Sequence, residues 1–206
     1  MKSNHNLLII FTRNPELGKV KNRLAEEVGN AAALNIYKFL LQHTISVTAP
    51  LSCDKAVYYS ENLDLQDNWD PAVFQKKLQK GEDLGDRMKN AFNEGFRDGY
   101  KNIVIIGSDM YDISSEDITL AFSALEEKEF VIGPAQDGGY YLLGMNSMEN
   151  AIFKNKNWGT SVVLQQTLQD LKDRNIHLLE TRNDVDYLED IKDEAAFQQF
   201  LQHLKI

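Results

Sequence analysis

The chain has 206 residues, of which 43% are hydrophobic, and its formal net charge is −9 at pH 7. This length suits a domain that buries roughly 70% of its unfolded surface, and we expect residues 1–206 to form a single domain. The acidic balance argues against a nucleic-acid polymer as partner, because such binding needs a broad basic surface. No apolar run approaches the ~20 residues of a membrane span.

Cysteine content and the first residues bear on the compartment. Cys53 is the lone cysteine, so it has no partner for an internal disulfide. The first six residues, MKSNHN, lack the apolar core of a signal peptide. We therefore expect a cytoplasmic protein in which the Cys53 thiol is packed rather than reactive.

The first predicted elements are a strand, a loop and a helix. Residues 7–11 (LLIIF) form a continuous apolar run, which is typical of a strand buried on both faces. Residues 14–18 (NPELG) predict a loop because they contain proline and glycine. Residues 20–28 then carry an apolar side chain at every fourth position, which indicates one face of a helix.

Basic side chains gather where this loop meets the helix. They are Arg13, Lys19, Lys21 and Arg23, and residues 1–24 carry a local net charge of +4 that leaves −13 for the rest. Free N–H groups and the positive end of a helix dipole favour an anion at such a place. The enclave predicts a phosphate site for a small ligand, and the alternative is a solvated basic helix face.

Further along, predicted helices alternate with predicted strands. Apolar spacing, and a capping box from Ser114 to Asp117, predict helices at residues 31–49, 84–96, 114–125, 161–172 and 187–204. Short apolar runs predict strands at residues 55–59, 73–78, 102–107, 130–132, 140–145 and 177–179. This alternation predicts a three-layer α/β sandwich with a mostly parallel sheet. The two consecutive strands separated only by a loop suggest one antiparallel insertion.

Acidic side chains follow several predicted strands. In open α/β sheets ligands bind beyond the carboxyl ends of the strands, and Asp109 follows the strand at residues 102–107. Asp109 is the first candidate ligand for Mg²⁺ or Mn²⁺, with Asp186 as the second and Asp184 in reserve, since these cations take carboxylate oxygens and bridge them to phosphates. Alternatively, Asp109 caps the next helix, and the other two begin the last helix.

A glycine-rich loop separates the two consecutive strands. Gly138 and Gly139 allow backbone to approach a ligand, with Asp137 before them as a candidate base or acceptor-orienting group and Tyr140 behind. The alternative is an ordinary hairpin turn. The isolated segment Trp158-Gly159-Thr160 is either a stacking wall of an acceptor pocket or part of the core.

Other chemistries find little support in the sequence. The four histidines lie far apart without metal-ligand spacing, which argues against zinc. The sequence has no G-x-S-x-G, Walker A or G-x-G-x-x-G motif. Hydrolase triads and dinucleotide redox chemistry are therefore minor options.

Four segments in order resemble a known family. They are FTRNPELGKVKNRLA, GEDLGDRM, IGSDMYDIS with GPAQDGGYYLLG, and NDVDYLEDI. Together they resemble the radical-SAM/selenodomain-associated transferases, a glycosyltransferase-like bacterial family. That family belongs to the GT-A nucleotide-diphospho-sugar transferases, beside the guanylyltransferases of molybdopterin and deazaflavin-cofactor synthesis.

The resemblance implies a GT-A fold and a division of roles among the site residues. The implied nucleotide- and phosphate-binding residues are Arg13, Gly18, Lys19, Lys21, Arg23, Gly85 and Arg87. Asp109 and Asp186 stand at positions that related enzymes use for Mg²⁺ or Mn²⁺. The candidate acceptor-binding residues are Gly138, Gly139, Tyr140, Trp158 and Thr160.

The chain also departs from the pattern of that family. The family usually has Lys, Thr, Pro, Ser and Thr-Pro where this chain has Arg13, Asn22, Tyr111, Gly159 and Tyr187-Leu188. Asn22 removes a hydroxyl from the phosphate loop, and Tyr111 alters the turn beside a candidate metal ligand. These two changes suggest altered substrate choice or weakened catalysis.

The expected function is a metal-dependent glycosyltransferase that uses a nucleotide-sugar donor and a small-molecule acceptor. In it, Asp137 would orient or deprotonate an acceptor hydroxyl. One alternative is a nucleotidylyltransferase, in which a phosphate on the acceptor attacks a nucleoside triphosphate and pyrophosphate leaves. Another is a non-catalytic nucleotide-binding module. The sequence carries no signal for an oligomeric state.

Overall fold

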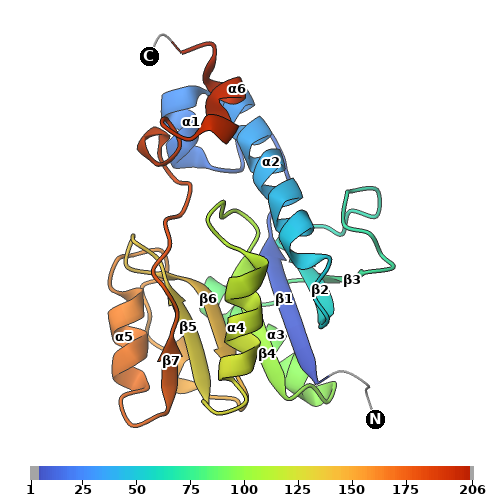
Figure 1. The fold of residues 1–206 in the computed structure, drawn as a ribbon, viewed down its shortest axis with the longest axis vertical. Helices are drawn as coiled ribbons and strands as arrows, with labels where there is room; N and C mark the ends of the chain where they lie inside the picture. Colours follow the sequence, from blue (N-terminus) through green and yellow to red (C-terminus); the bar gives the residue numbers. More distant parts are fainter. Residues whose placement is uncertain (1–4, 205–206) are drawn as a thin grey trace.

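A seven-stranded sheet forms the middle layer of the computed structural model, which describes residues 5–204. In chain order the strands are β1 (Asn6–Thr12), β2 (Asp54–Tyr59), β3 (Phe74–Leu78), β4 (Asn102–Gly107), β5 (Phe130–Pro134), β6 (Tyr140–Met145) and β7 (Ile176–Leu178). They lie in the order β3-β2-β1-β4-β6-β5-β7 (Figure 1). Only β6 runs antiparallel to its neighbours, so the predicted antiparallel insertion is confirmed.

Helices cover both faces of this sheet. The α-helices described in residues 5–204 are α1 (Asn22–Val28), α2 (Asn30–Thr48), α3 (Leu84–Arg97), α4 (Ser115–Ala124), α5 (Val163–Asp170) and α6 (Gln198–Leu201), of which α1 and α6 lie beyond the end of the sheet. Apolar side chains of α2 and α4 pack on one face, and those of α3 and α5 pack on the other. The predicted three-layer α/β sandwich is therefore confirmed. The predicted capping box from Ser114 to Asp117 begins α4.

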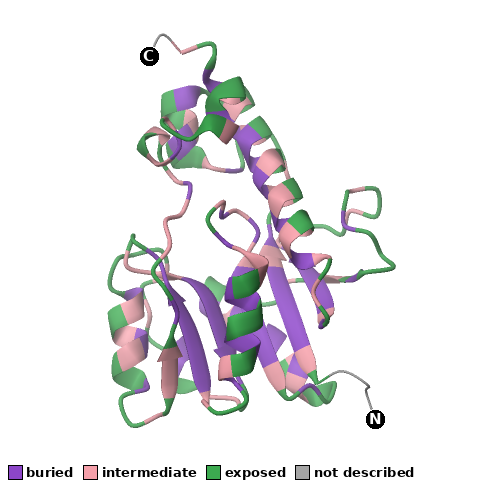
Figure 2. Ribbon diagram, in the orientation of Figure 1, coloured by how far each residue is buried: buried purple, intermediate pink, exposed green. Residues whose placement is uncertain are grey.

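Strand β1 shows why the apolar runs are continuous. Leu8 and Ile10 point to the core beneath α2 and α4, while Leu7 and Ile9 point to the core beneath α3. All four residues are at most 1% exposed, and the central strands are mostly buried, whereas the edge strands β3 and β7 are largely not (Figure 2). Burial of each such side chain stabilises the folded state by roughly 1.5–3 kcal/mol. The central strands therefore form the stable framework of the molecule.

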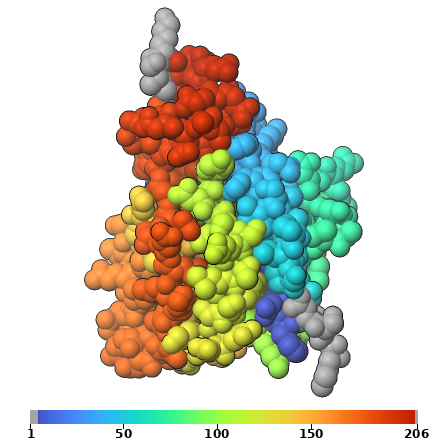
Figure 3. Space-filling model, viewed as in Figure 1, coloured from blue at the N-terminus to red at the C-terminus, as the bar shows by residue number. Residues whose placement is uncertain are grey.

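A third apolar cluster lies beyond the carboxyl ends of the strands. It joins Leu24 of α1 and Ile36 of α2 to Val185, Phe197 and Leu201 of the C-terminal segment. In the space-filling view this red segment packs against the blue end of α2 (Figure 3). The cluster holds the chain around Asp186 beside the loop that precedes α1.

The closing helix predicted at residues 187–204 is wrong. The chain instead forms two short 3-10 turns, Leu188–Asp190 and Ala195–Phe197, followed by α6. The Asp190 carboxylate accepts hydrogen bonds from the backbone N–H groups of Asp186 and Tyr187, which competes with helix formation. Moreover, the buried residues Ile191 and Phe197 are six positions apart and cannot share one helix face.

Two further features are the length of the helices and the burial of Cys53. Within residues 5–204, no helix is long and apolar enough to cross a membrane. Cys53 is only 8% exposed, and burial raises the pKa of its thiol to about 11. A thiol with this pKa stays protonated near neutrality, which agrees with the expectation that Cys53 is packed rather than reactive.

Candidate functional site

The site lies where the carboxyl ends of β1 and β4 meet. These strands pair in parallel with Phe11 opposite Gly107, so the residues that follow them emerge side by side. A cavity of about 260 Å³ opens at this edge. Its polar and aromatic lining residues are Asp109, Asp137, Asp184, Thr160, Phe11, Tyr140, Tyr141 and Trp158.

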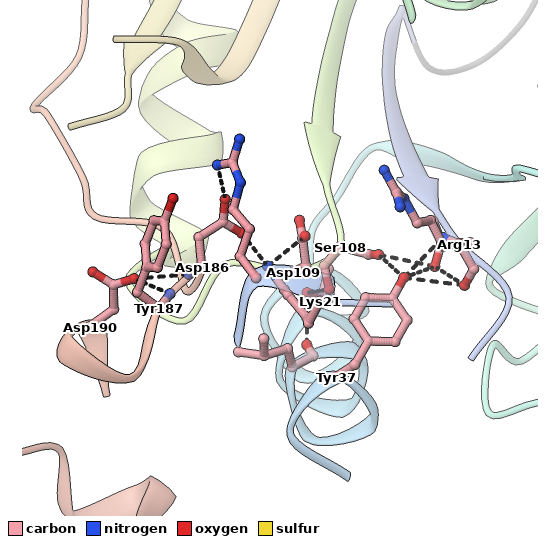
Figure 4. A network of polar contacts seen from close by, with 12 residues as sticks. Arg13, Lys21, Tyr37, Ser108, Asp109, Asp186, Tyr187 and Asp190 are labelled. Atoms are coloured by element: carbon pink, nitrogen blue, oxygen red, sulfur yellow. Dashed lines mark hydrogen bonds and ion pairs between the residues drawn. The ribbon is translucent and has the colours of Figure 1, made fainter. Parts of the chain in front are cut away.

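Lys21 lies between the two carboxylates predicted to bind a metal. Its Nζ is 2.8 Å from Oδ2 of Asp109 and 3.4 Å from Oδ1 of Asp186 (Figure 4). The Lys21 side chain is only 4% exposed, whereas those of Asp109 and Asp186 are 45% and 32% exposed. The structure thus brings together three of the predicted residues, which lie far apart in the sequence.

The backbone at Lys21 is unusual for a residue with a side chain. Its φ of 49° and ψ of 49° lie in the left-handed region, where lysine is uncommon. Helix α1 begins only at the next residue, Asn22, and has seven residues. Therefore the basic side chains, rather than the dipole of a long helix, determine the local charge.

The Lys21–Asp109 pair has clear electrostatic consequences. Burial alone would raise the pKa of Asp109, but the charges of Lys21 and Arg13 outweigh it and lower that pKa below its ordinary value. Burial likewise disfavours the charged form of Lys21, yet the two carboxylates raise the pKa of its ammonium. Both groups are therefore charged throughout the neutral pH range.

Asp186 also pairs with Arg23, and a further acidic residue, Asp190, holds it in place. Arg23 Nη1 is 3.2 Å from Asp186 Oδ2, and its guanidinium lies 5.8 Å from the ring centre of Tyr187. Asp190 Oδ2 accepts from the N–H groups of Asp186 and Tyr187 at 2.9 and 2.7 Å. The sequence analysis did not identify Asp190, although an acidic residue three positions after Tyr187 is a recognisable capping signal.

Tyr37 of α2 holds the loop that begins at Arg13, and it was also missed. Its buried hydroxyl accepts from Arg13 N–H at 2.9 Å and lies 3.4 Å from Ser108 Oγ and 3.3 Å from Thr12 Oγ1. Ser108 in turn donates to Thr12 Oγ1 at 3.0 Å. A buried tyrosine usually has a hydrogen-bond partner for its hydroxyl, and that tendency was the available signal.

Asp184 faces the cavity, in the segment that follows β7. The neighbouring Arg182 anchors this segment through an ion pair with Asp117 at 2.9 Å and backbone bonds to Pro134 and Gln136. Burial, together with the charges of nearby Asp186 and Asp137, raises the pKa of Asp184 to about 6. Asp184, the reserve candidate for a metal ligand, thus lines the cavity, whereas Asp186 does not.

The glycine-rich loop forms a turn at the edge of the cavity. Asp137 Oδ1 accepts from Gly139 N–H at 2.7 Å, as in an ordinary turn, and Asp137 also lines the cavity. Gly138 has a φ of +88°, and a Cβ there would lie 2.2 Å from the carbonyl oxygen of Ser161. Only glycine allows the loop to pack against the chain before α5.

Trp158 forms one wall of the cavity and packs on the beginning of α3. A Cβ at Gly85 would lie 2.5 Å from Cζ2 and Nε1 of the Trp158 ring, so this contact depends on glycine. Thr160 lines the same cavity, while its hydroxyl donates to the carbonyl oxygen of Asn157 at 2.7 Å. Trp158 therefore packs on α3 and also lines the cavity, and its contact with an acceptor stays a prediction.

Other predicted phosphate-binding residues lie elsewhere. Lys19 pairs with Glu16 at 2.7 Å and Glu61 at 3.4 Å, on the exposed side of the loop. Arg87 donates to the carbonyl oxygen of Gly81 at 3.2 Å, where it holds the entry to α3. Gly18 has a φ of +75° and serves the turn of the first loop. None of these three contacts Asp109 or Asp186.

The departure at Tyr111 has a structural role. Its ring lies 4.9 Å from those of Phe197 and His43 and 5.8 Å from that of Phe39, measured between centroids. It thereby connects the turn after Asp109 to the C-terminal segment. These aromatic contacts help to hold the turn after Asp109 in place.

The donor set can be tested against a divalent cation. No group of three or more His, Cys, Asp or Glu side chains that could hold a metal ion is found among residues 5–204. Asp109 and Asp186, however, already share one positive charge, the Lys21 ammonium. Hard oxygen donors of this kind suit Mg²⁺ or Mn²⁺, whose remaining ligands are commonly phosphates and water. The two carboxylates therefore fit such a cation.

Fold and site together define the class. The seven-stranded, mostly parallel sheet with its antiparallel β6 matches the nucleotide-diphospho-sugar transferase fold. The chain belongs to the DUF2064 family, described as "Uncharacterized protein conserved in bacteria", whose family model matches residues 44–160. No curated protein matches the chain.

Solved structures with this fold include proteins with described activities. A candidate nucleotide-diphospho-sugar transferase from Desulfovibrio desulfuricans G20 is 31% identical, covers 97% of this chain and 94% of its own, and has a TM-score of 0.84. The 4-diphosphocytidyl-2C-methyl-D-erythritol synthase from Anaerococcus prevotii DSM 20548 is 11% identical, with coverages of 95% and 96% and a TM-score of 0.61. A manganese complex of Rv0371c from Mycobacterium tuberculosis H37Rv is 11% identical, with coverages of 98% and 100% and a TM-score of 0.53. The latter two show likeness of fold alone.

Proposed function

We propose that the protein is a metal-dependent transferase that moves a glycosyl group from a nucleotide sugar to a hydroxyl of a small-molecule acceptor. One observation carries this proposal, namely the composition of the cavity. Three carboxylates line it, from Asp109, Asp137 and Asp184, together with aromatic and apolar walls. Among the described residues, no lysine or arginine lines it.

This composition favours a neutral acceptor over a phosphorylated one. In nucleotidyl transfer the acceptor brings a phosphate, which would meet the carboxylates of Asp137 and Asp184 in a partly enclosed site where repulsion is poorly screened. Sugar hydroxyls, in contrast, donate hydrogen bonds to carboxylates. The apolar face of a sugar ring can also pack on an aromatic side chain such as Trp158. The acceptor proposed is therefore a polyhydroxylated molecule without phosphate.

The nucleotide's diphosphate would bind beside the cavity, where the basic side chains are. Lys21 and Arg23 are already positioned by Asp186, and Arg13 begins the adjoining loop. Asp109 and Asp186 would hold the cation, which offsets negative charge on the departing nucleoside diphosphate when it is bound. The description of the Desulfovibrio relative and the four segments resembling radical-SAM/selenodomain-associated transferases support this division.

Asp137 is the proposed acceptor-orienting residue. Its Oδ1 accepts from Gly139 N–H, which fixes the carboxylate at the cavity and leaves Oδ2 for an acceptor hydroxyl. In the reaction, the acceptor oxygen forms a bond to the anomeric carbon while the bond from that carbon to the diphosphate breaks. The hydroxyl proton passes to Asp137, and the nucleoside diphosphate leaves.

A product screen tests this proposal. The protein is incubated with nucleotide sugars, Mn²⁺ and a panel of hydroxyl acceptors, and the products are analysed by mass spectrometry. We expect a glycosylated acceptor and free nucleoside diphosphate, and we expect Asp137→Asn to lose turnover while it keeps nucleotide affinity. Pyrophosphate release from a nucleoside triphosphate and a phosphorylated acceptor would contradict the proposal. That outcome would instead favour nucleotidyl transfer, the reaction type of the synthase with the same fold.

A further inference from the structure

Lys21 lies between the two carboxylates that would hold the cation in the proposed function. Its ammonium contacts both Asp109 and Asp186, and with 4% exposure it is nearly removed from water. The side chain reaches this point from a left-handed backbone conformation that costs free energy for any residue other than glycine. Because this conformation is unfavourable for lysine, contacts with the surrounding residues must hold Lys21 in it.

We propose that Lys21 is a built-in counter-cation that must leave Asp109 and Asp186 before a divalent cation binds, so that the cation binds together with the nucleotide. The inference rests on the proposed function, because it assumes that a cation and a diphosphate share this edge of the sheet. It adds an order of events to that function. The free protein keeps its carboxylates neutralised, and the nucleotide is needed to release them.

The geometry explains why a cation alone binds weakly. To reach the two carboxylates it must displace an ammonium that is paired with both, which leaves a nearly buried positive charge without a partner. In return it gains only these two protein ligands, since no group of three candidate side chains occurs in residues 5–204. The loss of the Lys21 pairs therefore opposes the gain from coordination.

A bound diphosphate increases the gain from coordinating the cation and reduces the cost of displacing Lys21. Its oxygens supply ligands that complete the shell of the cation, as phosphates commonly do for Mg²⁺. They also supply a new anionic partner for the displaced ammonium, which four rotatable bonds allow to move without any change in the backbone. Arg23 already pairs with Asp186 from the exposed side and can remain there. Nucleotide and cation thus favour each other's binding.

The test measures Mn²⁺ binding in the absence of nucleotide, by calorimetry and by the electron paramagnetic resonance signal of free Mn²⁺. We expect Lys21→Met to bind Mn²⁺ about 10-fold more tightly than the native protein, within the 5–150-fold range that is usual for coupled sites. Lys77→Met is the matched control. Lys77 also bridges two carboxylates, Glu94 at 2.9 Å and Asp98 at 3.6 Å, outside the proposed site. We expect no such gain in that variant.

Three outcomes would overturn the inference. They are an unchanged Mn²⁺ affinity in Lys21→Met, a weaker one, or an equal gain in Lys77→Met. Lys21→Gln guards against misfolding, because it retains a hydrogen-bond donor for the two carboxylates, and the same gain is expected. The proposed function fails separately, if the native protein shows no transfer in the product screen while the Mn²⁺ comparison still holds.

Discussion

The indole ring of Trp158 lies directly over Gly85, so that a single added carbon at Gly85 would come within 2.5 Å of the ring. The contact joins the first turn of α3 to the loop before α5, two elements that pack on the same face of the sheet. It also fixes the wall of the cavity that the proposed acceptor would meet. Because Gly85 has no side chain, the Trp158 ring can lie against α3 and form a wall of the proposed acceptor site.

We expect Gly85→Ala to destabilise the protein by about 1–3 kcal/mol, because overpacking forces a neighbouring ring to move. Urea unfolding measures this cost. If the contact with Trp158 is the cause, the penalty largely disappears when Gly85→Ala is combined with Trp158→Ala. An undiminished penalty in the double variant would contradict the explanation.

Tyr37→Phe removes the hydroxyl that accepts from Arg13 N–H and approaches Ser108. We expect a loss of stability of about 1–3 kcal/mol, the usual cost of leaving a buried polar group without its partner. We also expect weaker binding of nucleoside diphosphates, since the loop beginning at Arg13 loses its anchor. Tyr58→Phe is the control, because the Tyr58 hydroxyl is buried and has no hydrogen-bond partner within residues 5–204. Equal effects of the two variants would argue against a specific role for Tyr37.

The stability contributed by Asp184 should depend on pH. The folded-state pKa of about 6 lies above the ordinary value of 3.8, so folding favours the protonated form and stability falls as pH rises from about 4 to about 6. In metal-free buffer, Asp184→Asn should be more stable than the native protein by about 1–2 kcal/mol at pH 8, a value reduced for partial exposure, and nearly equal at pH 4. Urea unfolding at both pH values measures the difference. A difference that does not change with pH would contradict it, and exposed Asp173→Asn serves as the control.

Asp190→Ala should loosen the segment that carries Asp186, because two backbone N–H groups lose their acceptor. We expect faster hydrogen exchange at the amides of Asp186 and Tyr187 and weaker Mn²⁺-dependent nucleotide binding. Glu189→Ala is the adjacent control, since that side chain is 76% exposed and pairs with the neighbouring Lys192. Unchanged exchange at both amides would show that Asp190 does not position the segment.

The sheet was predictable because buried strands leave a strong trace in the sequence. Residues 7–11 and 102–107 are apolar at nearly every position, and both form central strands with both faces covered. The antiparallel β6 followed from the short loop between two consecutive strands. By contrast, the C-terminal segment has apolar residues that pack on α1 and α2 without helical periodicity, so its pattern was misinterpreted as one long helix.

The site was predictable by residue type but not by contact. Chemistry and position marked Lys21, Asp109 and Asp186 as candidates, yet nothing in the sequence shows that the lysine lies between the two acids. That contact depends on the left-handed backbone at Lys21 and on the register of β1 against β4. Lys19 and Lys21 look equivalent in the sequence. In the structure, however, Lys19 pairs with Glu16 and Lys21 pairs with Asp109.

The central claim is that a nucleoside diphosphate binds beside Lys21 through a divalent cation that Asp109 and Asp186 hold. Calorimetric titration of nucleoside diphosphates into the native protein and into Asp109→Asn, each with Mn²⁺ and with EDTA, tests it most directly. We predict that EDTA weakens binding to the native protein at least about 10-fold, a free-energy difference of about 1.4 kcal/mol, and has little effect on Asp109→Asn. Equal affinities of the native protein with Mn²⁺ and with EDTA, or a full Mn²⁺ effect in Asp109→Asn, would contradict the claim.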